Sequence, residues 1–210
     1  MTARGALQRG LGELALVLPS GAAEKLLAYL ELLEKWNKTY NLTAIRDPLQ
    51  AVSHHVLDSL AVLPELSGHK GALADVGSGG GLPGIPIAIV EPARHVTLND
   101  ASGKKGAFLR QAVIELGLRN ADVHVGRAEH WRPAERFAVV ITRGFASVVD
   151  FLAACRHLVA PGGVLAAMKG TYPADELASV PADCDCREVR RLSVPLLDAE
   201  RHVVLCKVGA

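Results

Sequence analysis

The stretch of residues 75–84, Asp-Val-Gly-Ser-Gly-Gly-Gly-Leu-Pro-Gly, constrains the fold of this chain more than any other, and we call it the glycine turn. It follows the apolar residues 72–74, and Pro83 and Pro86 lie where the next apolar segment begins. Both prolines fit a first helical turn, because the N–H group that proline lacks would have no intrahelical partner there. We therefore predict a strand, a tight turn and a helix. Such a turn exposes backbone N–H groups to a nucleotide-like ligand, and an ordinary glycine-rich loop is the alternative.

The composition of the chain predicts one globular domain with an appendage. Half of its 210 residues are hydrophobic, which supplies a sizeable core. A net charge of +1 gives no overall nucleic-acid signature, so any RNA or DNA binding has to rest on a local patch. No apolar run reaches membrane-spanning length, and residues 14–18 are too short for the core of a secretory leader. We expect a cytoplasmic protein that contacts no membrane.

The four cysteines are expected to stay reduced, because a chain of this length without a secretory leader rarely carries a disulfide framework. Cys155 falls on the apolar side of a predicted helix and fits the core. Cys184 and Cys186 lack the second cysteine pair that would make a zinc site convincing, and Cys206 stands alone near the end of the chain. No metal site is predicted.

Two patterns divide the chain into an N-terminal helical extension, residues 1–70, and a core of alternating strands and helices, residues 71–210. This alternation predicts a parallel sheet with helices on both faces. The last two strand candidates have no helix between them long enough for a crossover, so we expect them to close the sheet as an antiparallel pair. The predicted strands are 72–76, 95–99, 122–126, 137–142, 163–168, 187–194 and 202–208, and the predicted helices of the core are 83–91, 103–116 and 148–159.

In the extension, Leu26, Leu30 and Leu33 recur at helical spacing, and Ser20 is expected to cap the helix that carries them. Residues 36–43 lose this period and are rich in polar side chains that bind backbone groups. They are predicted to form a structured loop.

A second helix of the extension begins at Asp47, which fits an N-cap because Pro48 follows it at the first helical position. This helix carries His54, His55 and Asp58, and the helical spacing can bring either histidine beside the carboxylate. One interpretation makes them substrate contacts or a rigid polar bridge to the glycine turn. The other is a surface pair that supports the helix.

The glycine turn contains two overlapping cofactor patterns. Gly79-x-Gly81-x-x-Gly84 matches the dinucleotide pattern, whereas Asp75-x-Gly77-x-Gly79-x-Gly81 matches the turn of S-adenosylmethionine (AdoMet) methyltransferases. A carboxylate just before the turn would repel a pyrophosphate. AdoMet has no phosphate and carries an ammonium and a sulfonium, which Asp75 would attract. The pattern therefore favours AdoMet.

Later strand ends agree with this interpretation. Asp100 ends the second strand, about 20 residues beyond the turn, where an acid can accept both ribose hydroxyls. Arg127, Ala128 and Glu129 follow the third strand, where an adenine would rest on backbone and apolar surface. Residues 94–143 hold nine Lys or Arg against five Asp or Glu, a weak sign of a polyanionic partner that a solvated surface would also give.

The residues that come after the fourth strand constrain the methyl acceptor. Residues 141–146 lack the Asn or Asp with Pro-Pro-aromatic that enzymes methylating exocyclic amines usually carry. Carbon methylation needs a cysteine nucleophile, and Cys155 does not fit that role. A purine ring nitrogen has its own lone pair and needs neither base nor nucleophile, so positioning would carry the catalysis and no catalytic residue is predicted. Arg143 is expected to bind a cofactor carboxylate, a phosphate or a base edge.

Several blocks of the sequence together resemble one family, the bacterial small-subunit ribosomal RNA guanine-N7 methyltransferases (RsmG), also called the glucose-inhibited division protein B family. The likeness runs from about residue 26 to the C-terminus. Its most specific parts are the Asn-Leu-Thr of residues 41–43 and the Leu-Pro-Gly-Ile-Pro of residues 82–86. The other matching blocks are residues 36–40, 55–60, 75–81, 103–105, 108–109, 127–129, Arg143 and 169–170.

The resemblance implies a class I AdoMet-dependent methyltransferase fold, Rossmann-like, with a mostly parallel seven-stranded sheet and an N-terminal helical extension. It implies a guanine in the 530 loop of 16S ribosomal RNA as substrate and AdoMet as cofactor. The implied cofactor site comprises Asp75, Gly77, Ser78, Gly79, Leu82, Asp100, Ala128, Glu129 and Arg143. The implied RNA-binding residues are His55, Lys104, Lys105, Arg127, Arg143 and Lys169.

We therefore expect a monomeric enzyme that methylates N7 of a guanine in 16S ribosomal RNA, either in the free RNA, in a precursor or in the small subunit. Two alternatives remain open on the sequence. One is a small-molecule methyltransferase on the same core. The other is an RNA- or ribosome-binding protein with a vestigial cofactor turn.

Overall fold

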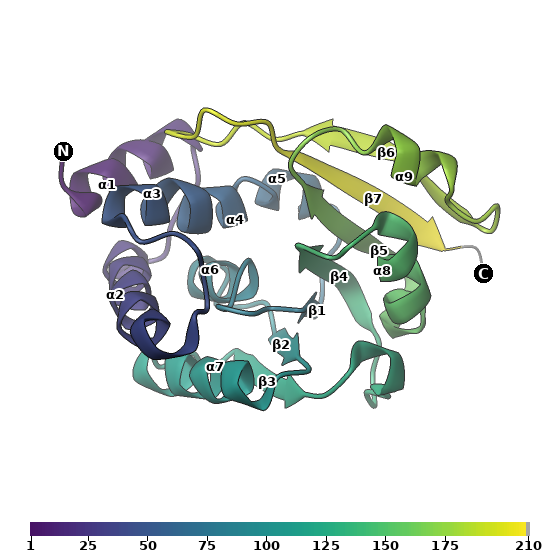
Figure 1. Cartoon of the computed structure of the whole chain (residues 1–210), viewed down its shortest axis with the longest axis horizontal. Coiled ribbons are helices and arrows are strands. Elements are labelled where there is room, and N and C mark those ends of the chain that lie inside the picture. The colour runs from purple at the N-terminus through teal and green to yellow at the C-terminus, as the bar shows by residue number, and fades with distance from the viewer. Residues whose placement is uncertain (209–210) are drawn as a thin grey trace.

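The protein is an α/β fold built on one seven-stranded sheet, seen in a computed structural model that describes residues 1–208 (Figure 1). The strand order is β3-β2-β1-β4-β5-β7-β6. Strands β1 to β5 are parallel, and β7 runs antiparallel to both β5 and β6. The strands are β1 (Leu73–Val76), β2 (Val96–Asp100), β3 (Ala121–Val125), β4 (Phe137–Arg143), β5 (Val159–Lys169), β6 (Cys184–Arg191) and β7 (His202–Val208).

Helices cover both faces of the sheet, as the alternating pattern predicted. Those of the extension are α1 (Ala3–Glu13), α2 (Ala22–Tyr40), α3 (Pro48–Ala51), the π-helical turn η1 (Val52–Leu57), α4 (Asp58–Leu60) and α5 (Leu63–Leu66). Those of the core are α6 (Gly84–Val90), α7 (Gly103–Glu115), the short turns η2 (Ala128–His130) and η3 (Arg156–Leu158), α8 (Val148–Cys155) and α9 (Ala174–Ala178).

Alternate residues of the strands feed two hydrophobic clusters, one on each face. Val139 and Ile141 of β4 pack with α6, α7 and the helices of the extension, while Val140 packs with α8. Leu26 of α2 and Phe108 of α7 are both fully buried in the first cluster. The extension therefore completes the same core as the sheet, and a division of the chain after residue 70 stays a prediction.

Two expectations for the extension are wrong. Gly21, with a left-handed backbone, precedes α2, so Ser20 is not its cap. The helix continues through residues 36–40, where a loop was expected, and ends at Asn41 with φ 50°. Trp36 explains the continuation, because its ring stacks on Tyr40 one helical turn later, with 5.1 Å between the ring centroids.

Other boundaries moved by a few residues. β5 begins at Val159 instead of residue 163, since its first part already pairs with β4, and α8 gives way to the turn η3 at Arg156. β6 begins at Cys184 instead of residue 187 because it pairs along β7 from there. The signals at both ends of α7 are confirmed: Ser102 Oγ accepts a hydrogen bond from Lys105 N, and Gly117 has φ 60°.

The expectation of four reduced cysteines is wrong for one pair. Cys186 and Cys206 form a disulfide, with 4.1 Å between their Cα atoms. The antiparallel pairing of β6 and β7 brings together two cysteines that are 20 residues apart in sequence. Cys155, the last residue of α8, is buried in the core, as predicted, and burial raises the pKa of its thiol to about 12.

Candidate functional site

The glycine turn lies at the carboxyl edge of the sheet, next to the ends of three further parallel strands. Asp75 is in register with Leu98 of β2 and with Ile141 of β4. Asp100 is in register with Val125 at the end of β3. The parallel order thus gathers the residues that follow β1, β2, β3 and β4 at one edge, which is where open α/β sheets bind ligands.

The backbone of the glycine turn is shaped by glycines that no other residue can replace without strain. Gly77 has φ 74° and Gly81 has φ 84°. A Cβ at Gly81 would come within 2.3 Å of Ile85, whereas a Cβ at Gly77 would meet no atom within 4 Å. The chain can therefore reverse closely onto α6 while the other side of the turn, above Gly77, stays open.

Asp75 is completely buried at the base of this turn. Its Oδ2 accepts a hydrogen bond of 2.9 Å from the backbone N–H of Gly84, at the start of α6. Its Oδ1 has no hydrogen-bond partner among residues 1–208. Burial raises the pKa of this carboxyl to about 7. Ser78 Oγ donates to the carbonyl of Asp75, and Leu82 is buried beside it in the turn.

Asp100 joins the second strand end to the turn. Its Oδ2 accepts from the backbone N–H of Gly79 at 3.0 Å, and its Oδ1 accepts from Ser102 N at 2.9 Å. Lys105 Nζ lies 3.8 Å from Oδ2. Each carboxylate oxygen has two lone pairs, so Asp100 keeps acceptor capacity after these bonds are made.

The end of β3 is bound to β2 through Asn99, a residue that the sequence did not single out. Asn99 Nδ2 donates to the carbonyls of His124 and Gly126, at 3.2 and 2.9 Å, and so links the ends of β2 and β3. Ala128 is buried after β3, while Arg127 and Glu129 on either side of it are exposed. The only sign of this role in the sequence is that Asn99, a polar residue, lies at the end of a predicted strand.

Arg143 ends β4 and does not stand alone. Its Nη1 donates to Asp58 Oδ2 and to the carbonyl of His54, both at 2.8 Å. Arg201, just before β7, donates from Nε to Asp58 Oδ1, also at 2.8 Å. Asp58 therefore holds two arginines, and neither His54 nor His55, which the helical spacing could have brought beside it, is its partner.

His55 faces the N-terminal loop. Its Nε2 lies 2.9 Å from Thr43 Oγ1, and Nδ1 has no partner among residues 1–208. Burial, together with the charge of Arg143, lowers the pKa of His55 to about 4, so the ring is neutral at physiological pH. His55 is only 4% exposed, and its expected role in RNA binding stays a prediction.

The basic residues that were expected to bind RNA differ in exposure and in whether they are already paired with an acid. Lys169 is mostly buried and its Nζ lies 2.8 Å from Glu176 Oε2, so its charge is already compensated. Lys104 and Arg127 are exposed, and Lys105 is partly exposed next to Asp100.

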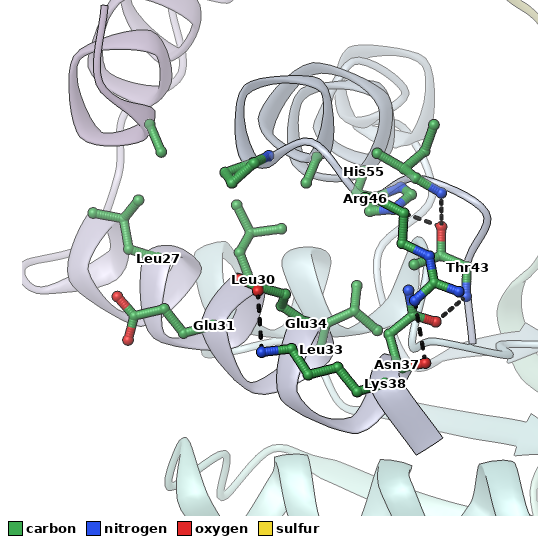
Figure 2. A pocket seen from close by; sticks show the side chains of 14 residues that line it. Leu27, Leu30, Glu31, Leu33, Glu34, Asn37, Lys38, Thr43, Arg46 and His55 are labelled. Atoms are coloured by element: carbon green, nitrogen blue, oxygen red, sulfur yellow. Dashed lines mark hydrogen bonds and ion pairs between the residues drawn. The ribbon is translucent and has the colours of Figure 1, made fainter. Parts of the chain in front are cut away.

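A cavity of about 360 Å³ opens on the outer side of α2, between this helix, α1 and α3 (Figure 2). Leu27 and Leu30 line one wall, and Thr43 and His55 lie at its polar end. Of the residues expected to bind cofactor or RNA, only His55 lines it. The cavity is therefore separate from the open side of the glycine turn.

Residues 1–208 contain neither a metal-binding cluster nor a membrane span. No group of three or more His, Cys, Asp or Glu side chains in this part of the chain is arranged to hold a metal ion. None of its helices is both long and apolar enough to cross a membrane.

Comparison with known proteins places this site in context. A family model described as GidB, rRNA small subunit methyltransferase G, matches residues 22–204. Two relatives named Ribosomal RNA small subunit methyltransferase G are 51% identical to the chain. That of Laribacter hongkongensis aligns over 94% of this chain and 95% of its own length, and that of Aromatoleum aromaticum over 95% and 96%.

Among solved structures, a SAM-dependent methyltransferase from Aquifex aeolicus matches 87% of this chain and 98% of its own, with a TM-score of 0.61 and 17% identity. This likeness concerns the fold alone, and it agrees with the mostly parallel seven-stranded α/β sheet that the sequence predicted.

Proposed function

The chain belongs to the rRNA small subunit methyltransferase G family, and we propose that it transfers a methyl group from AdoMet to N7 of a guanine in the 530 loop of 16S ribosomal RNA. The observation that carries the proposal is the junction of two strand ends at the glycine turn, where Asp100 accepts the N–H of Gly79 beside the open space above Gly77. The substrate is free 16S RNA, a precursor or the small ribosomal subunit.

The residues at this edge fit AdoMet. AdoMet supplies a methyl group on a positively charged sulfonium and also carries an ammonium. Two buried acids, Asp75 and Asp100, lie at adjacent strand ends. The Asp100 carboxylate gives the site a negative potential that suits a cation, and Asp75, whose pKa burial raises to about 7, adds to it when ionised. Asp100 is the acceptor for the ribose hydroxyls, and the apolar Ala128 is suited to an adenine. The remaining cofactor contacts that we propose are Gly77, Ser78, Gly79, Leu82, Glu129 and Arg143.

Guanine N7 is a suitable acceptor because its lone pair attacks without prior loss of a proton. The task left to the protein is to hold the base in line with the methyl–sulfur bond and to exclude water. Arg143, fixed by Asp58 at the end of β4, is a cation at the same edge of the sheet, and we propose that it helps to hold the base. Lys104, Lys105 and Arg127 are proposed to contact the RNA backbone. Location in the cytoplasm and a monomeric state stay predictions.

The test of the cofactor site replaces Asp100. We expect Asp100→Ala to raise the AdoMet dissociation constant about tenfold, measured by calorimetry, because a charge-assisted pair of hydrogen bonds is lost. Asp122→Ala is the matched control, since Asp122 is an exposed acid on β3 whose side chain contacts His95.

Unchanged affinity in Asp100→Ala would remove Asp100 from the site. Methyl transfer to small molecules without RNA would instead favour a small-molecule methyltransferase. Failure of the unmodified protein to bind AdoMet at all would favour an RNA-binding protein with a vestigial turn.

A further inference from the structure

We propose that Arg201 and Arg143 together form a binding site for a backbone phosphodiester of the RNA substrate, and that Asp58 is the positioning residue that holds both. This inference rests on the proposed function, since it says which residues at the same edge of the sheet bind the RNA. It adds a residue, Arg201, from the last loop of the chain.

The geometry begins with one buried carboxylate shared by two guanidinium groups. The side chain of Asp58 is 3% exposed, and each of its oxygens accepts one arginine at 2.8 Å. Two positive charges and one negative charge leave an excess of one positive charge. A buried carboxylate needs only one arginine to be compensated, so the second is not explained by the burial of Asp58.

Both arginines keep donors that a phosphate can use. A guanidinium carries five N–H groups. Within residues 1–208, Arg143 donates only from Nη1, and Arg201 donates from Nε and Nη1. The side chains of Arg143 and Arg201 are 24% and 22% exposed, so each group is fixed on one side and open to solvent on the other. A guanidinium group that is held in one orientation can donate hydrogen bonds to the oxygens of a phosphodiester.

The sheet order places this cluster on the acceptor side of the site. Arg143 is in register with Met168 of β5, and Lys169 is in register with His202, which follows Arg201. Arg201 thus lies across β5 from Arg143, whereas the glycine turn lies on β1, on the other side of β4. Neighbouring strands are about 4.8 Å apart, so Arg201 is roughly three strand spacings from the turn.

Charges nearby do not cancel the cluster. Lys169, at the end of the intervening strand, is paired with Glu176. His55, on the extension, is close enough for the charge of Arg143 to act on it, but its ring is neutral, since its pKa is lowered to about 4. Glu200 lies beside Arg201 in sequence, and its carboxylate is 3.9 Å from Arg191 on β6. Asp75 is close enough for the charge of Arg143 to act on it, but burial raises its pKa to about 7, so it is only partly ionised at neutral pH. An excess of positive charge therefore stays at Arg143 and Arg201.

The test measures binding of a fluorescent small-subunit rRNA fragment at several salt concentrations. We expect Arg201→Ala to weaken binding at low salt and to flatten the slope of log K against log salt by about 0.7–0.9, the contribution of one phosphate contact. Arg187→Ala is the matched control, because the Arg187 side chain is 90% exposed in the middle of β6 and pairs with Asp185, not with Asp58. The AdoMet dissociation constant should stay unchanged in both variants.

Asp58→Asn separates positioning from simple charge. This change adds one positive charge to the protein, so charge alone predicts tighter RNA binding and a steeper salt slope. The positioning role predicts the reverse, because an asparagine keeps only one acceptor oxygen and turns an NH2 group toward the other arginine, which then loses the bond that fixes it. Circular dichroism and a thermal scan establish whether Asp58→Asn folds. If it does not, the RNA affinities of Arg201→Ala and Arg201→Lys test the phosphate site instead.

Two failures can be told apart. If the unmodified protein methylates rRNA but Arg201→Ala binds RNA as Arg187→Ala does, the phosphate site is refuted and the proposed function stands. If Asp58→Asn folds and binds RNA more tightly, the positioning role of Asp58 is refuted, while the proposed function again stands. If the unmodified protein binds AdoMet but methylates no rRNA, the proposed function itself fails.

Discussion

Replacing Asp75 by Asn should make the stability of the protein depend differently on pH. Asp75 is fully buried, and burial raises the pKa of its carboxyl from 3.8 to about 7. Each pKa unit corresponds to about 1.4 kcal/mol, so ionised Asp75 costs the folded state about 4 kcal/mol. Between these two pKa values the folded state binds more protons than the unfolded chain. Stability from this group is therefore greatest at low pH and falls as pH rises toward 7.

Asparagine imitates the protonated carboxyl at every pH. It can still accept the N–H of Gly84, which Asp75 Oδ2 does at 2.9 Å. The free energy of unfolding of Asp75→Asn, minus that of the unmodified protein, should therefore increase by roughly 1 kcal/mol per pH unit between pH 5 and 7 and level off above. The contribution of His55 titration is common to both proteins and cancels in this difference.

Urea unfolding at pH 5, 6, 7 and 8 measures this difference. The slope of unfolding free energy against urea should be the same for both proteins, which shows that they expose the same surface. Asp198→Asn is the control, because Asp198 is an exposed acid in the loop before β7. A difference that does not change with pH would show that Asp75 is ionised throughout and would refute the reasoning.

Two further predictions concern the contacts between the extension and the site. Tyr29→Phe should lower the free energy of unfolding by about 1–2 kcal/mol, since the buried Tyr29 hydroxyl donates to the Gly80 carbonyl at 2.7 Å. Urea unfolding measures this loss, and no loss would mean that water replaces the bond. The unmodified protein should lose up to about 3 kcal/mol of stability between pH 6.5 and pH 4, because burial lowers the pKa of His55 to about 4. His55→Gln should reduce this loss, and an unchanged loss of stability in acid would contradict the prediction.

Elements with strong local signals were predictable from the sequence. The glycine turn joins β1 to α6 as expected, and β7 spans the predicted residues 202–208. α7 begins after Ser102 and ends before Gly117, because capping and left-handed backbone depend on residues that are close in sequence.

Features that depend on distant partners were not predictable. Asp58 pairs with arginines that are 85 and 143 residues away, and nothing in its own helix indicates either partner. The local spacing suggested the histidines instead. The disulfide of Cys186 follows from the pairing of β6 with β7, which the sequence predicted without fixing the register.

The most direct test of the central claim maps chain cleavage at N7-methylguanine in small-subunit rRNA after incubation with the protein and AdoMet. The proposed function predicts cleavage at one guanine of the 530 loop, dependent on AdoMet and strongly reduced with Asp100→Ala at limiting AdoMet. Methyl incorporation without cleavage at any guanine, or no incorporation when free 16S RNA, its precursor and the small subunit are each supplied, would contradict it.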